Sequence, residues 1–384
     1  MNIAIFTNNY LPNPYGVTTS IESFRRQFEK MGHKVYVFAP QSKGYEDENK
    51  NVFRFPSIDW KYKIKIPFPI PYSSEMDEII DGLDLDIIHS QHPNLLGQVA
   101  KKWAKKKEIP LVFTWHTLYD KYTSYIPLIP HEAVAKWAID NAVEYSNECD
   151  QVIVPTKSIE KLIQKWGVTN KNIADIPTGV DTETFQNPDG EKVRKKYGIA
   201  DDEILLFSAS RLTDEKNIIF LLRSVIQVLK DNNNVKFILG GEGYLEEEIK
   251  DIISDNGLRE KIILTGLIDR GELKDYFGAA DVFVYASQSE TQGSIISEAM
   301  HSGLPVVTVD STGSCDLIKH EKTGILVECD REKFSSAVNQ LVKDENLRES
   351  LGKKAKEISQ EKYTDKVCAE KMIEVYRELI NSNS

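Results

Sequence analysis

Two carboxylates and a glycine in one short stretch suggest ligand chemistry. Glu290 and Glu298 stand eight positions apart, with Gly293 between them. The apolar run 281–286 predicts a buried parallel strand and residues 295–302 predict a helix, so we expect Glu290 on the connecting loop and Glu298 about one turn into the helix, facing the same crevice. Gly293 would let a ligand approach the backbone, and the helix start would offer N–H groups to an anion. Either acid alone would be an ordinary solvated side chain. Together these groups predict a site for a sugar nucleotide, with N–H groups for phosphate and carboxylates for hydroxyl groups.

A second candidate site lies on an earlier strand-to-helix turn. Arg211 and Lys216 stand between a predicted strand at 203–208 and a predicted helix at 218–230. Two cations beside a helix start can clamp a pyrophosphate, because arginine binds two oxygens at once and lysine supplies a point charge. The alternative is that both cations form surface salt bridges with the acidic residues between them.

Three further positions follow predicted strands, where α/β proteins bind ligands. His116 stands at the end of the strand 110–114, and Gly241 lies in a glycine-rich turn after the strand 235–239. Gly16 precedes the first helix, in a loop without a G-x-G-x-x-G pattern, which argues against a nicotinamide dinucleotide. A plain turn glycine is the alternative interpretation of Gly16.

Strands and helices alternate along the whole chain, which predicts an α/β fold of two doubly wound, Rossmann-like domains. At 384 residues the chain is long for one core. We place the boundary in the polar segment 182–202, which gives an N-terminal domain at 1–180 and a C-terminal domain at 181–364. A last amphipathic helix occupies 365–384 and is expected to cross back to the N-terminal domain.

Composition limits the partners. The net charge of −11 argues against general nucleic-acid binding. Residues 1–180 carry 21 basic and 21 acidic side chains, so the acidic excess lies in the remainder, and the N-terminal half could tolerate an anionic surface. The four cysteines have no metal or redox spacing. No signal peptide or membrane-spanning run is evident, which predicts a cytoplasmic protein.

Two stretches could touch a membrane. Residues 60–72 alternate aromatics, prolines and lysines, and residues 95–107 predict a basic amphipathic helix. An edge strand and a solvated helix face are the favoured explanations of these two stretches. The apolar, aromatic segment 119–129 is a candidate for the edge of a binding site for an apolar acceptor. Alternatively, it is buried between domains.

Taken together, six motifs resemble the retaining glycosyltransferases of family four, which have the GT-B fold of two Rossmann-like domains facing across a cleft. These motifs span nearly the whole chain in family order: Tyr10-Leu11-Pro12 with Gly16-Val17-Thr18, Trp115-His116-Thr117, Ile176-Pro177-Thr178-Gly179-Val180-Asp181, Arg211-Leu212 with Glu215-Lys216-Asn217, Gly240-Gly241-Glu242-Gly243, and the Glu290/Glu298 pair. The variant Glu290-Thr291-Gln292-Gly293 looks most like bacterial 1,2-diacylglycerol 3-glucosyltransferases. Ser294 and His92-Pro93 differ from that subgroup and leave the acceptor open.

The resemblance assigns a role to each position. Arg211 and Lys216 would neutralise the diphosphate leaving group, helped by the backbone from Gly293 through Ser294 to Ile295. Glu298 would accept hydrogen bonds from the ribose, and Glu290 would contact the sugar of the donor. His116 would contact the 6-hydroxyl of the transferred sugar, and Gly16 and Gly241 would let backbone line the donor pocket.

The implied reaction moves a hexosyl group, expected to be glucose from UDP-glucose, to a lipid acceptor, expected to be diacylglycerol. No cofactor or metal is implied, because the cations and the helix start take the charge that Mg²⁺ takes elsewhere. Peripheral contact with an anionic membrane at the inner face of the cell membrane would go through the N-terminal domain. Three alternatives remain: transfer to a soluble sugar, polyol or polysaccharide, a non-catalytic binder, and a sugar-nucleotide epimerase.

Overall fold

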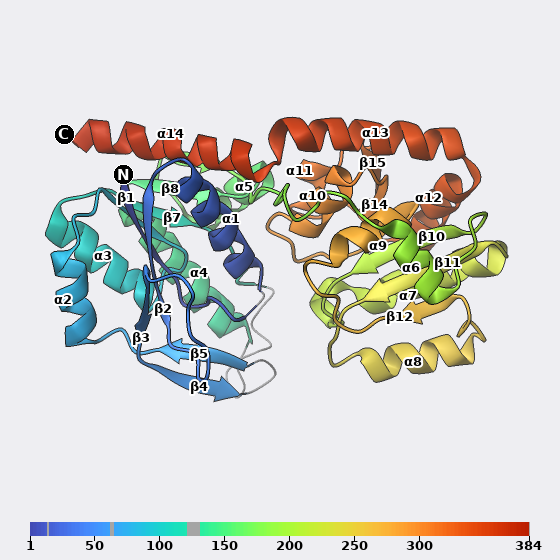
Figure 1. Cartoon of the computed structure of the whole chain (residues 1–384), viewed down its shortest axis with the longest axis horizontal. Helices are drawn as coiled ribbons and strands as arrows, with labels where there is room; N and C mark the ends of the chain where they lie inside the picture. The colour runs from blue at the N-terminus through green and yellow to red at the C-terminus, as the bar shows by residue number, and fades with distance from the viewer. Residues whose placement is uncertain (14, 62–64, 121–130, 384) are drawn as a thin grey trace. The chain divides into compact units, whose positions relative to one another are not determined.

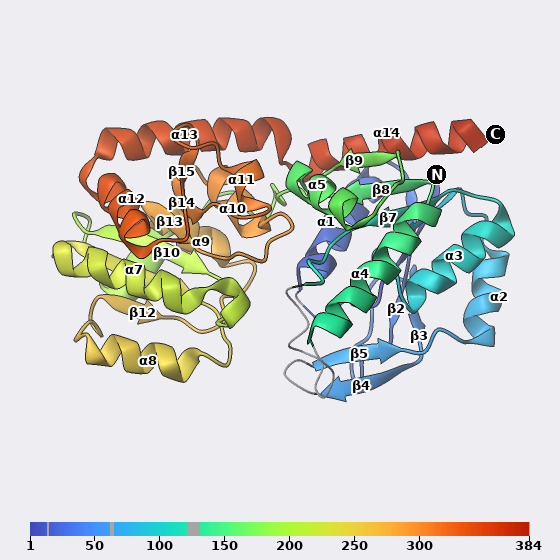
Figure 2. The same cartoon turned by 180° about the vertical axis from the view of Figure 1, so that it is seen from behind.

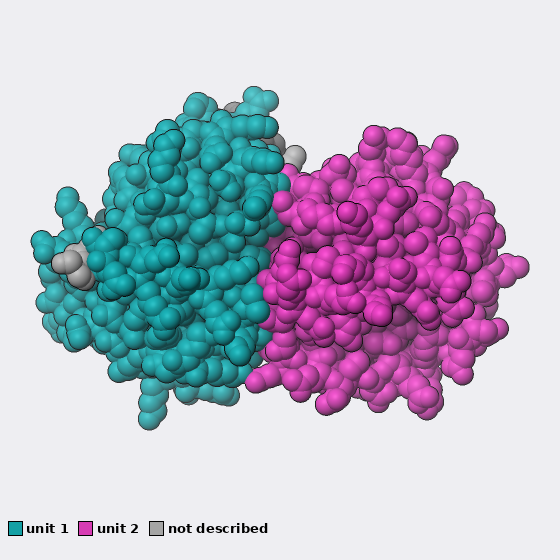
Figure 3. Space-filling model, turned by 90° about the horizontal axis from the view of Figure 1, so that it is seen from above, with its two compact units in different colours: residues 1–179, 365–384 teal, residues 180–364 magenta. Residues whose placement is uncertain are grey.

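A computed structural model describes residues 1–383 apart from 14, 62–64 and 121–130. The chain divides into two compact units, which Figure 3 colours separately: Met1–Gly179 with Asp365–Ser384, and Val180–Thr364. Most of the aromatic segment expected as an acceptor lip lies outside the described residues. Among the described helices, none is both long and apolar enough to cross a bilayer.

The first unit is built on a parallel sheet of seven strands in the order β3-β2-β1-β6-β7-β8-β9. The strands are β1 (Asn2–Phe6), β2 (Lys34–Pro40), β3 (Val52–Phe55), β6 (Ile87–Ser90), β7 (Leu111–Thr114), β8 (Gln151–Val154) and β9 (Ile173–Asp175). Strands β1 and β6 are neighbours, so the strand order reverses between them. In doubly wound sheets, ligands bind where the order reverses, outside the carboxyl ends of the strands.

Helices cover both faces of this sheet (Figure 1, Figure 2). The helices are α1 (Gly16–Lys30), α2 (Ser74–Gly82), α3 (Leu96–Lys107), α4 (His131–Glu148), α5 (Lys157–Trp166) and α14 (Asp365–Asn383). The chain end returns to this unit, because α14 packs beside α1 and buries Met372, Ile373 and Tyr376 with Phe24 and Phe28. A separate antiparallel hairpin joins β4 (Ser57–Lys61) to β5 (Lys65–Pro69).

The second unit repeats the plan with six parallel strands in the order β12-β11-β10-β13-β14-β15. The strands are β10 (Ile204–Ala209), β11 (Val235–Gly240), β12 (Ile262–Leu264), β13 (Val282–Tyr285), β14 (Val306–Val309) and β15 (Gly324–Val327). Here the order reverses between β10 and β13, which pair directly. Both strands are almost entirely apolar and buried, as expected for a sheet that is covered on both faces.

The second unit also has helices on both faces of its sheet (Figure 1). They are α6 (Gly190–Tyr197), the 3₁₀ turn η2 (Asp214–Lys216), α7 (Ile218–Asp231), α8 (Glu246–Asp255), α9 (Leu273–Ala279), α10 (Ser294–His301), α11 (Ser314–Leu317), α12 (Arg331–Lys343) and α13 (Glu345–Lys362). One core lies between the sheet and α7, α8 and α12, and a second lies beneath α9 and α10. The predicted α/β class with two doubly wound sheets is confirmed.

Helix α2 ends at Gly82, and strand β6 begins at Ile87. The polar segment 182–202, where the domain boundary was predicted, contains α6, which is held by the Arg194 guanidinium. Arg194 donates to the carbonyl of Ala279 at 3.0 Å and to the carboxylate of Asp281 at 2.7 Å. This segment is therefore part of the second unit.

Candidate functional site

The chain brings the predicted donor residues to the carboxyl ends of β10 and β13. Arg211 and Lys216 lie on the connection between β10 and α7, and Glu290 lies on the connection between β13 and α10. Because β10 and β13 are adjacent, these two connections meet at the point where the strand order reverses. Residues about 80 positions apart in the sequence thereby share one site.

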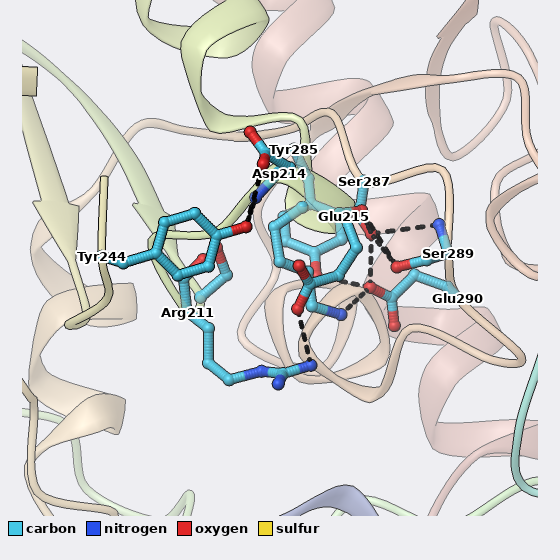
Figure 4. Close-up of polar contacts among 10 residues, drawn as sticks. Arg211, Asp214, Glu215, Tyr244, Tyr285, Ser287, Ser289 and Glu290 are labelled. Atoms are coloured by element: carbon cyan, nitrogen blue, oxygen red, sulfur yellow. Dashed lines mark hydrogen bonds and ion pairs between the residues drawn. The ribbon is translucent and has the colours of Figure 1, made fainter. Parts of the chain in front are cut away.

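Glu290 is the centre of a hydrogen-bonded cluster (Figure 4). Its Oε1 accepts from the Lys216 ammonium at 2.5 Å, the Ser287 hydroxyl at 2.6 Å and the Tyr285 hydroxyl at 2.8 Å. The Lys216 and Glu290 side chains are only 11% and 13% exposed, so this ion pair is largely out of water. A buried pair with extra donors holds its geometry much more firmly than an exposed one.

The cluster fixes the protonation of its members. Burial by itself would raise the pKa of the Glu290 carboxyl, but the Lys216 charge and the hydrogen bonds together hold that pKa below its ordinary value. Burial and the neighbouring Glu290 raise the pKa of the Tyr285 phenol. Glu290 is therefore a carboxylate at neutral pH, and Tyr285 stays protonated as a donor.

Arg211 lies beside this cluster with its guanidinium partly in solvent. It pairs with Glu215 at 3.1 Å, and its side chain is 34% exposed. The turn that carries both cations is braced from two sides: the Ser289 hydroxyl donates to the carbonyl of Glu215 at 2.9 Å, and the Tyr244 hydroxyl donates to the carboxylate of Asp214 at 3.0 Å. The loop after β13 thus positions the loop after β10 (Figure 4).

Helix α10 begins at Ser294, a few residues after Glu290. Gly293 precedes its first turn with φ of +80°, a conformation that favours glycine, and Ser294 and Ile295 are the first helical residues. A Cβ at Gly293 would stand 3.6 Å from the Cγ of Glu290, so the helix start and the cluster are in contact. The first N–H groups of an α-helix have no partner in the preceding turn and favour an anion.

Glu298 does not join this cluster. It lies one turn into α10, is 3% exposed, and pairs through Oε1 with the Arg270 guanidinium. Its Oε2 is buried and, among the described residues, has no hydrogen-bond partner. The predicted acidic pair therefore splits into two carboxylates, each with its own cation.

Gly241 is required by the fold itself. Its φ is +127°, and a Cβ there would stand 1.8 Å from the carbonyl oxygen of Ser210. The glycine-rich turn packs directly on the backbone that leads into Arg211, so its first role is to support that loop.

His116 and Gly16 lie in the first unit, after β7 and β1. The His116 Nε2 is 2.6 Å from the side-chain oxygen of Gln91, and burial, with smaller contributions from His92 and His89, lowers the pKa of His116 to about 3. His116 is therefore a neutral imidazole that donates to Gln91. Gly16 has an ordinary φ, and a Cβ there would meet no described atom within 4 Å, so the fold does not need glycine at this position.

Sequence reasoning missed several residues of the site. Tyr285 ends a strand that was predicted to be buried, so it was assigned to the core. Ser287 belongs to no recognisable motif. Arg270 and Gln91 each contact a predicted residue, yet neither belongs to the motifs that carried the resemblance. Across the described residues, no group of three or more His, Cys, Asp or Glu side chains is arranged to hold a metal ion.

Comparison with known proteins places the chain in a family. The model of the family described as "Glycosyltransferase Family 4" matches residues 14–184, and that of "Glycosyl transferases group 1" matches residues 189–358. The chain is 31% identical over its full length to the alpha-monoglucosyldiacylglycerol synthase of Streptococcus pneumoniae, covering 87% of that protein. It is 30% identical to the same-named enzyme of Acholeplasma laidlawii, covering 98% of it.

A further relative is the sulfoquinovosyl transferase SQD2 of Arabidopsis thaliana, 30% identical over 94% of this chain and 70% of that protein. Among solved structures, HepE of Anabaena in complex with UDP and glucose superposes with a TM-score of 0.79 at 18% identity, covering 99% of this chain and all of that one. The sucrose-phosphate synthase of Thermosynechococcus elongatus superposes with a TM-score of 0.81 at 18% identity, covering 99% of both chains.

The two doubly wound sheets and these structural neighbours define the GT-B fold. The chain belongs to glycosyltransferase family 4. The family and the fold predicted from the motifs are thereby confirmed.

Proposed function

We propose that this glycosyltransferase moves glucose from UDP-glucose to diacylglycerol with retention of the anomeric configuration. The observation that carries the donor half is the convergence of Arg211, Lys216, Glu290 and the start of α10 at the carboxyl ends of β10 and β13. The acceptor half rests on the two alpha-monoglucosyldiacylglycerol synthases that match the whole chain. Because UDP-glucose is itself an α-glucoside, an alpha product means retention.

In this proposal the second unit holds the donor. Arg211, Lys216 and the N–H groups of Ser294 and Ile295 receive the charge that develops on the departing diphosphate. A lysine ammonium has three donors, so Lys216 can hold Glu290 and contact a phosphate oxygen together. The remaining oxygen of Glu290 is then available for a glucose hydroxyl.

The two carboxylates do not act as the acid and base of a hydrolase. Glu290 is ionised and bound to Lys216, while Glu298 is bound to Arg270, so both are better suited to accept hydrogen bonds than to move protons. We propose that Glu298 holds the ribose and Glu290 the sugar. Retention then follows from attack on the same face that the diphosphate leaves.

In this proposal the first unit supplies the acceptor side. The neutral imidazole of His116 donates through Nε2 to Gln91, so its Nδ1 accepts from the 6-hydroxyl of the glucose. Gly16 leaves the open space that a phosphate or sugar needs at the start of α1. Gln91 holds the His116 ring through its Nε2.

Contact with lipid is proposed to go through the β4–β5 hairpin at the inner face of the cell membrane. Ile58 and Phe68 stand opposite each other in the antiparallel register, and Ile70 follows on the same face. The three side chains are 63%, 54% and 37% exposed, and Tyr72 beyond them is 84% exposed. Large apolar side chains gathered on one exposed face indicate an interaction surface.

The direct test follows nucleoside diphosphate release with UDP-, GDP- and ADP-glucose, each with and without diacylglycerol vesicles. We expect release only with UDP-glucose and lipid, and a glycolipid product. The Arg211→Ala variant should lose about 100-fold in turnover with its fold intact, because the side chain is partly exposed. Transfer to a soluble sugar without vesicles would replace the lipid assignment. Donor binding without release would indicate a non-catalytic binder, and an epimerised donor would indicate an epimerase.

Membrane contact has its own test. The Ile58→Ser/Phe68→Ser variant should reduce co-sedimentation with anionic vesicles several-fold while UDP binding stays at the wild-type level. Leu267→Ser is the matched control, because Leu267 is 68% exposed in the second unit. Equal sedimentation of all three proteins would rule out the hairpin as the contact.

A further inference from the structure

The carboxylate of Glu298 is only half satisfied by the protein. Glu298 is 3% exposed, and its Oε1 accepts from Arg270. Its Oε2 is also buried and has no hydrogen-bond partner within the described parts of the chain. A buried carboxylate oxygen without a donor is costly, so this atom is set up for a donor that arrives with a ligand.

Arg270 is held in place from several sides. It comes from the loop between β12 and α9, and its guanidinium lies over the Phe185 ring, 5.5 Å from the ring centre. Burial alone would lower the pKa of Arg270, but Glu298 and then Asp181 raise it above its ordinary value. The Arg270 side chain is still 44% exposed, whereas that of Glu298 is 4% exposed, so Arg270 lies between the buried carboxylate and solvent.

We propose that Arg270 is a positioning residue for nucleotide binding, which fixes Glu298 so that its free oxygen faces the ribose hydroxyls of the donor. This inference rests on the proposed function, because it takes Glu298 as the ribose acceptor. A planar guanidinium fixes the orientation of the carboxylate that it binds, whereas a water molecule in its place would leave the carboxylate free to rotate. Because Arg270 contacts Oε1, the other carboxylate oxygen of Glu298 is left to accept from a ligand hydroxyl.

A role through the ribose can be separated from a purely structural one. If Arg270 acts through Glu298, its loss weakens only the part of binding that comes from the ribose hydroxyls. If Arg270 merely stabilises the second unit, its loss weakens the binding of all nucleotides equally. The informative quantity is therefore the ratio of the dissociation constants of 2′,3′-dideoxy-UDP and UDP, measured by calorimetry.

We expect a ratio of about tenfold or more for the full-length wild-type protein, since two hydroxyls bind one carboxylate. The ratio should fall to about threefold or less in Glu298→Gln and in Arg270→Ala. Arg270→Lys keeps the charge without the planar fork and should lie between. Arg259→Ala is the matched control, because Arg259 is an arginine of the same unit that donates to the Ser254 hydroxyl at 2.9 Å at an exposed site. Its ratio should equal that of the wild type.

A wild-type ratio in Arg270→Ala, with affinity for both nucleotides reduced alike, would overturn the inference. If Arg270→Ala fails to fold, Arg270→Lys and Arg270→Gln decide, and a wild-type ratio in both again overturns it. A wild-type protein that binds neither UDP nor its dideoxy form would instead refute the proposed donor. A reduced ratio in Glu298→Gln alone would leave the ribose contact standing and remove Arg270 from it.

Discussion

At the scale of single residues, the site is organised by cations that each hold one carboxylate. Lys216 holds Glu290, and Arg270 holds Glu298. The sequence pattern assigned Lys216, Glu290 and Glu298 directly to the ligand and missed Arg270. The structure adds that each carboxylate is first oriented by the protein, which reduces the freedom that donor binding must remove.

The Lys216–Glu290 pair should show strong coupling in stability. Lys216→Ala leaves a nearly buried carboxylate without its cation, so we expect the unfolding free energy to fall by about 2 kcal/mol or more. Glu290→Gln/Lys216→Ala should recover much of this loss, because the amide oxygen can still accept from Ser287 and Tyr285. Urea denaturation of both single variants and the double variant measures the coupling. Simple additivity of the two single losses would contradict it.

Two glycines should separate a role in folding from a role in binding. Gly241→Ala places a Cβ against the Ser210 carbonyl at a positive φ, and should cost about 3 kcal/mol or more. The added Cβ of Gly16→Ala meets no described atom within 4 Å, so the unfolding free energy of this variant should be unchanged or raised by up to about 1 kcal/mol. We expect Gly16→Ala nevertheless to raise the KM for the donor. An unchanged KM and full activity in Gly16→Ala would show that the open space at this position plays no part in donor binding.

At the scale of elements, the sequence predicted the strands and their order of appearance well because buried parallel strands are short and apolar. It predicted short, charged helices poorly. Helix α6 buries only Val193, so its apolar periodicity is too weak to recognise in a polar segment. The contact between Lys216 and Glu290 could not be derived from spacing either. It depends on β10 and β13 being neighbours, and strand order is a property of the whole sheet.

The C-terminal helix is tied to the first sheet through a buried histidine. His89 on β6 contacts the Tyr376 hydroxyl at 2.5 Å through Nδ1 and the Thr114 hydroxyl at 2.6 Å through Nε2. Burial lowers the pKa of His89 to about 3 in the folded protein. An unfolded chain has a histidine pKa of about 6.5, so protonation below that pH favours unfolding.

The stability that neutral His89 contributes is therefore complete above about pH 6.5 and is lost as the pH falls toward 3. At about 1.4 kcal/mol per pH unit, the loss between pH 7 and pH 5 amounts to roughly 2 kcal/mol. Urea denaturation at the two pH values should show a smaller change for His89→Gln than for the wild type. His320→Gln, an exposed histidine of the second unit, should keep the wild-type change. An identical pH response in all three proteins would contradict this account of His89.

At the scale of the whole molecule, each unit places its candidate residues at the carboxyl edge of its own sheet, beside the point where the strand order reverses. In the proposed function, the second unit binds the donor and the first unit binds the acceptor. The motifs predicted both sets, since they follow predicted strands. They could not predict the supporting residues Tyr285, Arg270 and Gln91, whose partners become visible only in three dimensions.

One measurement bears most directly on the proposed reaction: the anomeric configuration of the glycolipid that the wild-type protein makes from UDP-glucose and diacylglycerol vesicles, determined by nuclear magnetic resonance. We predict a single α-glucosyl product, with no product from the Arg211→Ala/Lys216→Ala protein. A β-glucoside would contradict retention at this site, and the absence of any glucosylated lipid would contradict the acceptor.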